Sequence, residues 1–506
     1  MTIRLHNTLT QRLEDFEPLV PGKVGVYVCG LTTYDLAHAG HARTYTSFDV
    51  LVRHLRVRGF EVTLVRNVTD VDDKILTRAK ESGEDPLELS GRMSDLCDAQ
   101  LREIGVADPT HEPRVSTHIV EIVALIADLI DKGHAYTADG PKGKDVYFSV
   151  RSFAPYGKLS HRKIDDLLSG ARVEVDDTKR DPLDFALWKG EPEGALGWPA
   201  PWGRGRPGWH IECSAMAAKY LGQHFDIHAG GMDLIFPHHE NELAQSEAAH
   251  GAPFARYWLH GGFLNVDKEK MSKSLGNFVT IQDVLARNDA EAFRYYLLST
   301  HYRGPTQFEV EKLADDRVVF PTVDEAERRI DYLYYTRESI DAIALENKDE
   351  TRSGPLAKIE AAAAESEARV LTALDNDLNA PQALAVLADL AKAANELVML
   401  FKKTKSDDAQ RPIRAVAATI AEQLRKACVP LGLMQAPFAQ FAVRTKERRL
   451  RIRGLEASRI DQKLADRSAA RLAKDFASAD AIRKELTALG IEVLDGTGDS
   501  SWRILA

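Results

Sequence analysis

This chain of 506 residues lacks long apolar runs, low-complexity tracts and a regular cysteine pattern. No apolar run approaches the roughly 18 residues that a membrane-spanning helix needs. Residues 1–13 also lack the apolar core of a signal peptide, so we expect neither membrane insertion nor export. The four cysteines follow no repeated spacing, which argues against a disulfide framework and for a reducing cytoplasm; they are Cys29, Cys97, Cys213 and Cys428.

A general excess of basic residues is also missing. The 66 lysines and arginines are outnumbered by 76 acidic residues, which leaves a formal net charge of −10. Net charge is a weak guide for a multidomain chain, because binding RNA needs only a local basic face. The hydrophobic fraction of 44% is typical of a globular protein, and the length allows about three or four domains.

Residues 24–74 form the most informative stretch of the chain. Residues 24–28 and 60–66 have the composition of buried strands. Between them, apolar residues recur at helical spacing, at Tyr45, Phe48, Leu51, Val52 and Leu55. The pattern predicts a βαβ crossover within a Rossmann-type nucleotide-binding domain. Cys29 would then lie at the carboxyl end of the first strand, where such folds bind ligands.

Two histidines, His38 and His41, lie at the predicted entry to this helix, where free N–H groups favour phosphate. Histidines at such a position are more often ordinary polar residues, and glycines such as the intervening Gly40 also simply make turns. Far downstream is the basic segment Lys270-Met271-Ser272-Lys273-Ser274. Together the two motifs resemble the signature of class I aminoacyl-tRNA synthetases, with Ala39 replacing the usual isoleucine.

Cys29, Cys213, His238 and Glu242 all fall at predicted strand ends or helix starts, so one crevice can collect them. Pro237 suits a first helical position, which would place His238 and Glu242 one turn apart on one helix. These residue types are zinc ligands. The alternative is two buried thiols beside a capped helix. A zinc hydrolase using Glu240 or Glu242 as base is disfavoured by the absence of a His-Glu-x-x-His motif.

Longer stretches carry a closer resemblance. GRPGWHIECSAM, HFDIHAGGMDLIFPHHENELAQS and EKMSKSLGNF are similar to cysteinyl-tRNA synthetases, and the match runs from residue 5 to residue 502. In that family the positions matching Cys29, Cys213, His238 and Glu242 bind one zinc ion. Ala229 departs from the family's glycine-rich turn. The resemblance implies that zinc selects the cysteine thiol over the hydroxyl of serine, which shape alone separates poorly.

The resemblance also implies the reaction and its partners. Cysteine would attack ATP, which carries Mg²⁺, to give cysteinyl-adenylate, and the acyl group would pass to tRNA(Cys). The catalytic and ATP-binding side chains implied are His38, His41, Lys270 and Lys273. Candidates to line the amino-acid pocket are Thr69, Trp209 and Asp233, although each is also readable as structural. We expect a cytoplasmic monomer.

The expected fold is an α/β Rossmann-type catalytic domain with an insertion, an α-helical bundle and a small C-terminal mixed α/β domain. The expected boundaries are 1–134 and 206–260 for the two catalytic halves, 135–205 for the insertion, 261–312 for the KMSKS loop and stem-contact region, 313–440 for the bundle and 444–506 for an anticodon-binding domain. Helices are predicted over 308–335 and 458–489, a linker over 402–412, and a final hairpin of 491–494 with 501–505.

Residues 444–453, the most basic run, are expected to contact RNA phosphates. The resemblance implies anticodon contacts from Arg471, Phe476, Asp480 and Asp495, and Phe476 either stacks on a base or lies in the core.

Two alternatives remain: a cysteine ligase that acts on a small amine, which would lack the C-terminal tail, and a non-catalytic RNA-binding paralogue. A cysteine persulfide side activity is disfavoured, because Thr77 replaces the second lysine of the family's motif.

Overall fold

The computed structural model describes residues 2–163, 178–266, 269–270, 278–314, 316–345, 353–494 and 500–506. The chain divides into two compact units. The first unit comprises Met1–Gln282, Thr300–Gln307 and Leu371–Ala383, and the second comprises Asp283–Ser299, Phe308–Val370 and Leu384–Ala506.

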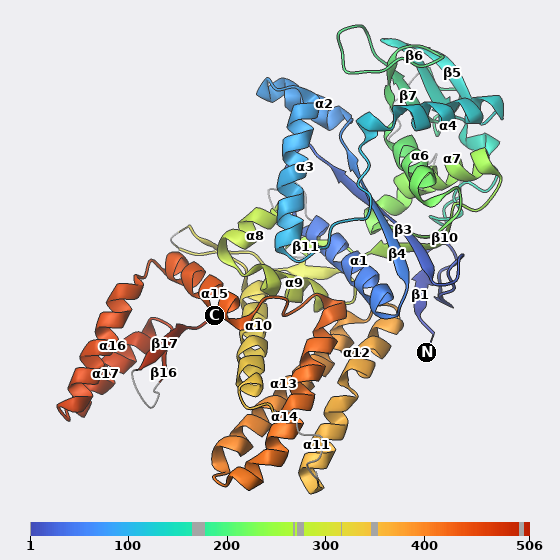
Figure 1. Ribbon diagram of the computed structural model, residues 1–506. Helices are drawn as coiled ribbons and strands as arrows, with labels where there is room; N and C mark the ends of the chain where they lie inside the picture. The colour runs from blue at the N-terminus through green and yellow to red at the C-terminus, as the bar shows by residue number, and fades with distance from the viewer. Residues whose placement is uncertain are drawn as a thin grey trace. The chain divides into compact units, whose positions relative to one another are not determined.

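The first unit is built on a parallel sheet in the order β10-β9-β3-β4. Its strands are β3 (Lys23–Thr32), β4 (Glu61–Thr69), β9 (Phe225–Gly231) and β10 (Ala255–Gly261). Figure 1 shows α3 (Pro86–Glu103) on one side of β3 and β4, and α6 (Trp209–Leu221) and α7 (Glu240–His250) on the other. The strands are buried and mainly apolar, as expected when helices cover both faces of a parallel sheet. This arrangement confirms the predicted Rossmann-type fold.

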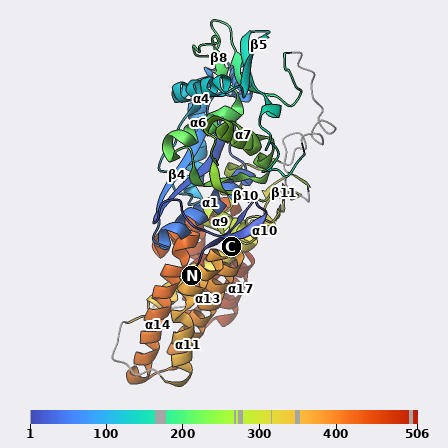
Figure 2. The same ribbon diagram turned by 90° about the vertical axis from the view of Figure 1, so that its right-hand side faces the viewer.

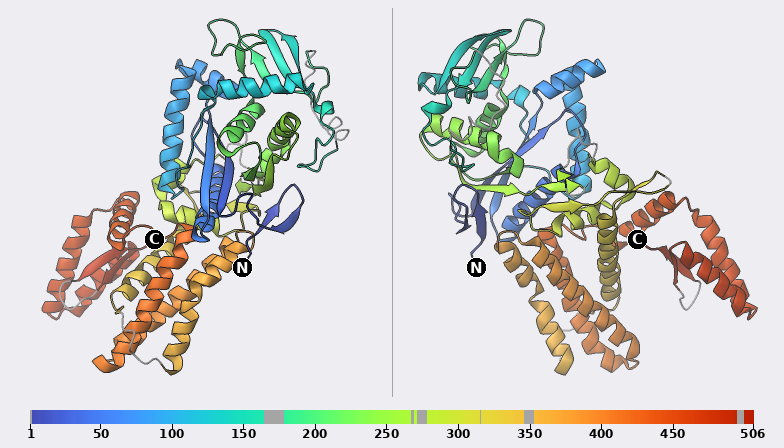
Figure 3. Two further views of the ribbon diagram at one scale, coloured as in Figure 1. Left: turned by 45° about the vertical axis from the view of Figure 1, so that its right-hand side comes forward. Right: turned by 180° about the vertical axis from the view of Figure 1, so that it is seen from behind.

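A second sheet of the first unit is antiparallel throughout, in the order β5-β6-β7-β8. Its strands are β5 (Ala135–Gly140), β6 (Gly143–Phe148), β7 (Phe185–Gly190) and β8 (Gly205–Pro207), within the segment that we interpret as an insertion. Two tryptophans, Trp188 and Trp202, pack edge to face in its core, with ring centroids 5.9 Å apart. Figure 3 shows this sheet beside α4 (Ile119–Asp131).

Shorter elements complete this part of the chain. β1 (Arg4–Asn7) and β2 (Arg12–Asp15) form a hairpin, and α1 (Ala39–Val57) and α2 (Asp73–Ser82) follow β3 and β4. A small sheet joins β11 (Leu264–Val266), β12 (Glu269–Lys270) and β13 (Thr306–Phe308), and α8 (Ile281–Arg287) comes between them in sequence.

The second unit is mainly helical. Its helices include α9 (Ala290–Leu298), α10 (Pro321–Asp341), α11 (Gly354–Ala364), α14 (Asp407–Cys428) and α15 (Phe438–Arg453). Two others, α12 (Ser366–Asp375) and α13 (Ala380–Lys403), are each divided between the units. Leu371–Ala383, which contains the end of α12 and the start of α13, belongs to the first unit, and the rest of both helices belongs to the second. Figure 2 shows α11, α13 and α14 side by side. Buried residues of α14 recur at helical spacing and fill the bundle core, at Ile413, Val416, Ala417, Ile420 and Leu424.

The C-terminal part of the second unit has its own core. It contains α16 (Ala457–Leu472), α17 (Phe476–Ala488) and the antiparallel hairpin of β16 (Ile491–Leu494) and β17 (Ser501–Ile504). The core residues are Ile460, Leu464, Leu486, Ile491, Val493, Trp502 and Ile504. The predicted hairpin is therefore present.

Three expectations about secondary structure are wrong. Residues 308–320 carry β14 (Glu311–Lys312) and β15 (Val318–Val319), and the helix begins only at Pro321, a favoured first helical position. The expected linker over 402–412 is largely helical, because Asp407 and Asp408 suit the positive start of α14. The single helix expected over 458–489 breaks at Lys474, whose φ is 61°, and Asp475 caps the second helix.

Among the described residues, no helix is both long and apolar enough to cross a membrane.

Candidate metal centre and nucleotide site

Four side chains from distant parts of the first unit converge on one point. The ligand atoms of Cys29, Cys213, His238 and Glu242 all lie within 4.8 Å of one another, and all four residues are buried. Cys29 belongs to β3, Cys213 to α6 and Glu242 to α7. Two sulfurs, one nitrogen and one carboxylate oxygen make a donor set that suits zinc.

His238 reaches this cluster from the start of a helical run. Phe236 has extended backbone, and helical backbone resumes at Pro237 and continues into α7, which is assigned from Glu240. Pro237 is therefore the first residue of this run, as expected. His238 lies one turn from Glu242, with Nε2 2.9 Å from Oε1.

The cluster is internally hydrogen-bonded. The Cys29 thiol donates to Glu242 Oε1 at 3.5 Å. Its hydrogen bond to Cys213 lowers the pKa of that thiol to about 6, against the effect of burial, whereas burial raises the pKa of Cys29 itself. Burial acts to lower the pKa of His238, but Glu242 and Cys213 raise it to about 10. The neighbouring acidic groups therefore favour the protonated, positively charged form of His238.

The structure also reveals a second set of donors that sequence reasoning missed. The ligand atoms of Cys29, His228, His239 and Glu242 lie within 4.8 Å of one another as well. His228 Nε2 is 2.8 Å from Glu242 Oε2, and His239 Nε2 is 3.2 Å from Cys29 Sγ. Cys29 was identified because it lies near the end of a predicted buried strand. His228 has the same kind of position in β9, so the same signal could have identified it.

The two sets differ in access to the surface. The ring of His238 stacks on Trp209, with centroids 4.2 Å apart, and Trp209 is 38% exposed. His228 and His239 are fully buried, and the His228 ring stacks on the buried Trp258. The set with Cys213 and His238 is thus the one that contacts a partly exposed side chain.

The three candidates for the amino-acid pocket surround the same edge of the sheet. Thr69 is buried at the end of β4 and donates to Glu212 Oε2 at 3.4 Å, so Glu212 is a further buried group that the sequence did not identify. Trp209 opens α6. Asp233 is exposed just after β9, where a Cβ on Gly231 would lie only 2.5 Å from its carboxylate.

His38 and His41 cap the start of α1 reciprocally. Each Nδ1 accepts the backbone N–H of the other residue at 3.3 Å, and the rings stack with centroids 3.5 Å apart. In a neutral imidazole the proton then belongs to Nε2, so both rings present an N–H donor. Residues 279–281, which follow the paired motif in sequence, lie close by, because Ala39 N donates to Val279 O and Ile281 N to Ala37 O. Lys273 and the side chain of Lys270 lie outside the described residues.

Three of the four candidate anticodon residues occupy α16 and α17. Phe476 is 62% exposed, so the alternative that placed it in the core is wrong. Arg471 and Asp480 are exposed, and Asp495 lies outside the described residues. The basic run of residues 444–453 does not face solvent throughout, because Arg448 and Arg449 are buried in ion pairs. The expected phosphate contacts are wrong for these two arginines.

Profiles of known protein families match three parts of the chain, and curated relatives match its full length. The family profile described as "tRNA synthetases class I (C) catalytic domain" matches residues 15–317. The DALR domain profile matches residues 369–435, and the profile of the cysteinyl-tRNA ligase anticodon binding domain matches residues 457–503.

The chain is 48% identical to the cysteine–tRNA ligase of Anaeromyxobacter dehalogenans over 100% of both chains. It is 45% identical to that of Geobacter metallireducens, again over 100% of both. For the chloroplastic and mitochondrial enzyme of Arabidopsis thaliana the identity is 44%, over 99% of this chain and 86% of the relative. Methionyl-tRNA synthetase of Mycobacterium tuberculosis in complex with methionyl-adenylate is similar in fold, with a TM-score of 0.62 at 17% identity over 86% of this chain and 94% of the other.

Proposed function

Because the chain belongs to the cysteine–tRNA ligase family of class I aminoacyl-tRNA synthetases, we propose that Cys29, Cys213, His238 and Glu242 hold one zinc ion that selects cysteine. The chain is an ATP-dependent ligase that joins cysteine to tRNA(Cys). The proposal therefore concerns the residues that perform this reaction. The single observation that carries it is the convergence of four buried donors on one point.

The residues fit the ion in number and kind. Two sulfurs with one imidazole and one carboxylate match a tetrahedral zinc shell. A carboxylate and a thiol of lowered pKa are costly to bury without a cation, and the cluster contains both. When bound, zinc supplies a soft Lewis-acid contact that favours a substrate sulfur over a hydroxyl oxygen.

The chain's own side chains orient the rest of the substrate. Asp233 offers an exposed carboxylate to the ammonium group of cysteine, and Trp209 covers the side of the pocket against His238. Thr69 lines its base. A pocket of this kind limits the mobility of the carboxylate that attacks ATP, which accelerates the reaction by positioning.

Nucleotidyl transfer from ATP depends mainly on the positioning of the reactants and on charges aimed at the phosphate oxygens. The Nε2–H groups of His38 and His41 and the positive end of α1 bind phosphate oxygens. Lys270 and Lys273 add positive charge, and Mg²⁺ accompanies ATP. Arg471, Phe476, Asp480 and Asp495 read the anticodon, and the enzyme acts as a cytoplasmic monomer.

Two alternatives are not favoured. A ligase for a small amine has no use for residues 457–503, which match the anticodon-binding profile. A non-catalytic paralogue is opposed by relatives that match over the full chain and bear the name of the ligase. Hydrolysis with Glu240 as base is also disfavoured, because its two carboxylate oxygens accept the backbone N–H groups of Gly157 at 2.8 Å and Ser160 at 2.7 Å.

ATP–pyrophosphate exchange tests the zinc proposal. We expect the wild type to exchange with cysteine and to discriminate against serine, and to contain one zinc ion per chain. Cys213→Ser should lose zinc and most of the discrimination, because the hydroxyl is a poor ligand. Cys97→Ser, which alters a buried cysteine of α3, is the matched control. It should change neither the zinc content nor the discrimination against serine. Equal exchange with both amino acids in the wild type, or unchanged selectivity in Cys213→Ser, would contradict the proposal.

A further inference from the structure

The basic helix α15 presents its arginines to two different environments. Phe441, Thr445, Arg448 and Arg449 are spaced by four, three and one residues, and all are buried on one face of the helix. Arg451 lies on the exposed side. The most basic run of the chain is thus divided between an interior face and a solvent face.

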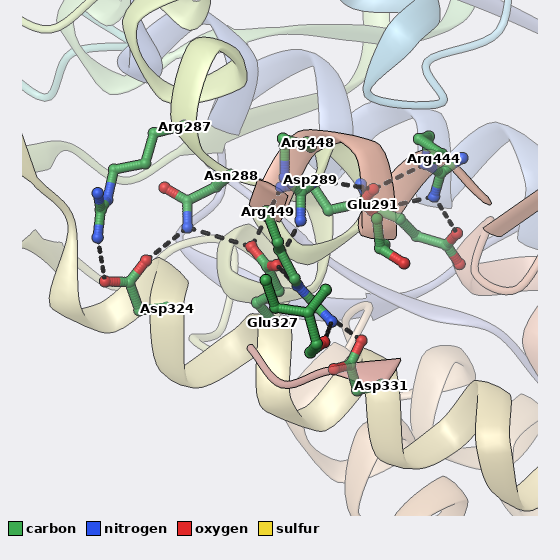
Figure 4. A network of polar contacts seen from close by, with 12 residues as sticks. Arg287, Asn288, Asp289, Glu291, Asp324, Glu327, Asp331, Arg444, Arg448 and Arg449 are labelled. Carbon is green, nitrogen blue, oxygen red and sulfur yellow. Dashed lines mark hydrogen bonds and ion pairs between the residues drawn. The ribbon is translucent and has the colours of Figure 1, made fainter. Parts of the chain in front are cut away.

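The interior arginines Arg448 and Arg449, and the more exposed Arg444, are held by acidic residues of the second unit. Arg444 and Arg448 bind Asp289, which caps α9, at 2.7 and 3.0 Å. Arg449 donates to Glu327 at 2.8 and 2.9 Å and to Asp331 at 2.8 Å, both on α10. Figure 4 shows these groups as one continuous network that Arg448 also joins through Glu327.

In this network the positive charges of the arginines nearly balance the negative charges of the carboxylates. Asp289 and Glu327 are buried, and the arginines supply several hydrogen bonds to each. Burial acts to raise the pKa of Asp289, but Arg448 and Arg444 hold it below its ordinary value. Guanidinium groups engaged in this way cannot also neutralise RNA phosphates, because their donors are already used.

Two arginines of α15, Arg449 from this network and Arg453, reach the C-terminal domain, residues 457–506. Arg449 Nη1 donates to the carbonyl of Ile504 at the end of β17, at 2.9 Å. One turn later, Arg453 donates to the carbonyls of Leu489 and Leu505, at 3.1 and 2.7 Å. The domain's hairpin is thereby tied to α15, and through Glu327 and Asp331 to α10. These contacts all lie within the second unit.

We propose that Arg449 and Arg453 are positioning residues, which hold the C-terminal domain on α15 in the orientation that charging of tRNA requires. The inference rests on the proposed binding of tRNA by this domain. A domain that reads an anticodon adds binding energy only if its orientation matches the bound RNA. Two arginines that bond carbonyls at the open end of the β16–β17 hairpin, where Ile491 pairs with Ile504, restrict rotation about the short connection between α15 and α16.

Arg449→Met tests the proposal in the full-length enzyme. ATP–pyrophosphate exchange with cysteine should stay near the wild-type rate, because it requires no tRNA. The kcat/KM for tRNA should fall at least about tenfold, mainly through KM, as expected for a misplaced binding element. The slope of log KM against log salt concentration should stay unchanged, because no phosphate contact is removed.

Arg451→Met is the matched control, since it removes the same charge from the exposed side of the same helix. It should leave charging of tRNA near wild type. If Arg451→Met costs as much as Arg449→Met and also lowers the salt slope, the run binds phosphate and the proposal is wrong.

Arg453→Met is the second test variant, because the described bonds of its side chain go only to carbonyls of the C-terminal domain. It should raise KM for tRNA without loss of exchange. If Arg449→Met fails to fold, the KM of Arg453→Met for tRNA is by itself the test of the proposal. Normal charging by Arg453→Met would overturn the proposal, whereas absence of exchange in the wild type would instead contradict the proposed function.

Discussion

Gly30 sets the distance between β3 and β4 directly beside Cys29. A Cβ at this position would lie 1.5 Å from the backbone oxygen of Asn67, and Gly30 N already donates to Asn67 Oδ1 at 2.8 Å. Backbone cannot yield as a flexible side chain does. The geometry of one candidate ligand therefore depends on the absence of a side chain at its neighbour.

We predict that Gly30→Ala separates the two strands, lowers the melting temperature and reduces bound zinc below one ion per chain. Gly91→Ala is the matched control, because nothing lies within 4 Å of its added Cβ in α3. Gly91→Ala should leave the zinc content unchanged and raise the free energy of unfolding by up to about 1 kcal/mol. Zinc analysis and thermal unfolding provide the measurements, and full zinc content in Gly30→Ala would contradict the prediction.

Asp98 predicts a pH dependence of stability. It pairs with Arg66 at 2.9 Å, but burial raises its pKa from 3.8 to about 6. A folded-state pKa above the unfolded value gives stability that is complete below about pH 4 and is lost as pH rises through about 6.

Relative to Asp98→Asn, which does not titrate, the wild type should therefore lose about 2 kcal/mol of unfolding free energy between pH 4 and pH 6.5. Paired denaturant titrations across this range measure the difference. A difference that stays constant with pH would show that the Asp98 pKa is not raised in the folded protein.

At the scale of elements, α1 is fixed at both ends within the first unit. Near its start, Arg43 donates to the carbonyls of His301 and Gly304, at 2.8 and 3.1 Å. Near its end, His54 and Arg58 bond Asp375 at 2.9 and 3.0 Å. Asp375 closes α12, and residues Leu371–Ala383 cluster with the first unit although most of α12 and α13 do not. The helix that begins with His38 and His41 is thus held by the α12–α13 corner.

We predict that Asp375→Ala destabilises the protein by about 3 kcal/mol, because it leaves the buried His54 and the half-buried Arg58 without their acceptor. The rate of ATP–pyrophosphate exchange should fall as α1 shifts. Asp389→Ala is the control, since that carboxylate is 71% exposed and 3.6 Å from Arg369. Equal melting temperatures for the two variants would refute the prediction.

The turn between α16 and α17 exposes two apolar side chains, Phe476 and Leu472, which are 62% and 87% exposed. Only Phe476 carries a ring that can stack on a base. Phe476→Ala should leave the melting temperature unchanged and weaken charging of tRNA about tenfold, within the range of one lost stacking contact. Leu472→Ala should change neither. An equal loss in both variants would indicate general apolar contact instead of stacking.

At the scale of the whole molecule, the network on α15 decides where the chain can be divided. A chain that ends at Val443 would lack Arg448 and Arg449 and leave Glu327 buried without its two arginine partners. A chain that ends at Gly454 keeps these ion pairs and loses α16, α17 and the hairpin, which have a separate core.

We predict that the chain ending at Gly454 retains exchange with cysteine and loses most charging of tRNA, whereas the chain ending at Val443 also loses stability. Exchange, charging and thermal unfolding distinguish the two. Full charging by the chain ending at Gly454 would exclude a role of the C-terminal domain in binding tRNA.

The sequence by itself determined the parts of this protein that depend on local order. The alternation and periodicity around β3, α1 and β4 predict a parallel crossover, because each pattern involves near neighbours in the chain. Cys29 and His38 could be singled out for the same reason, since strand ends and helix starts are local features. The final hairpin was likewise predictable from its two short strands.

Beyond the four donors that the sequence analysis had already grouped, only the tertiary structure decided which distant side chains meet. His228 and His239 join Cys29 and Glu242, and Arg448 and Arg449 turn inward to α10, through contacts between residues far apart in sequence. A basic run reads as solvated because its acidic partners lie more than a hundred residues away. Burial and pairing are properties of the folded chain, so a local pattern specifies which groups are present and packing determines what each of them contacts.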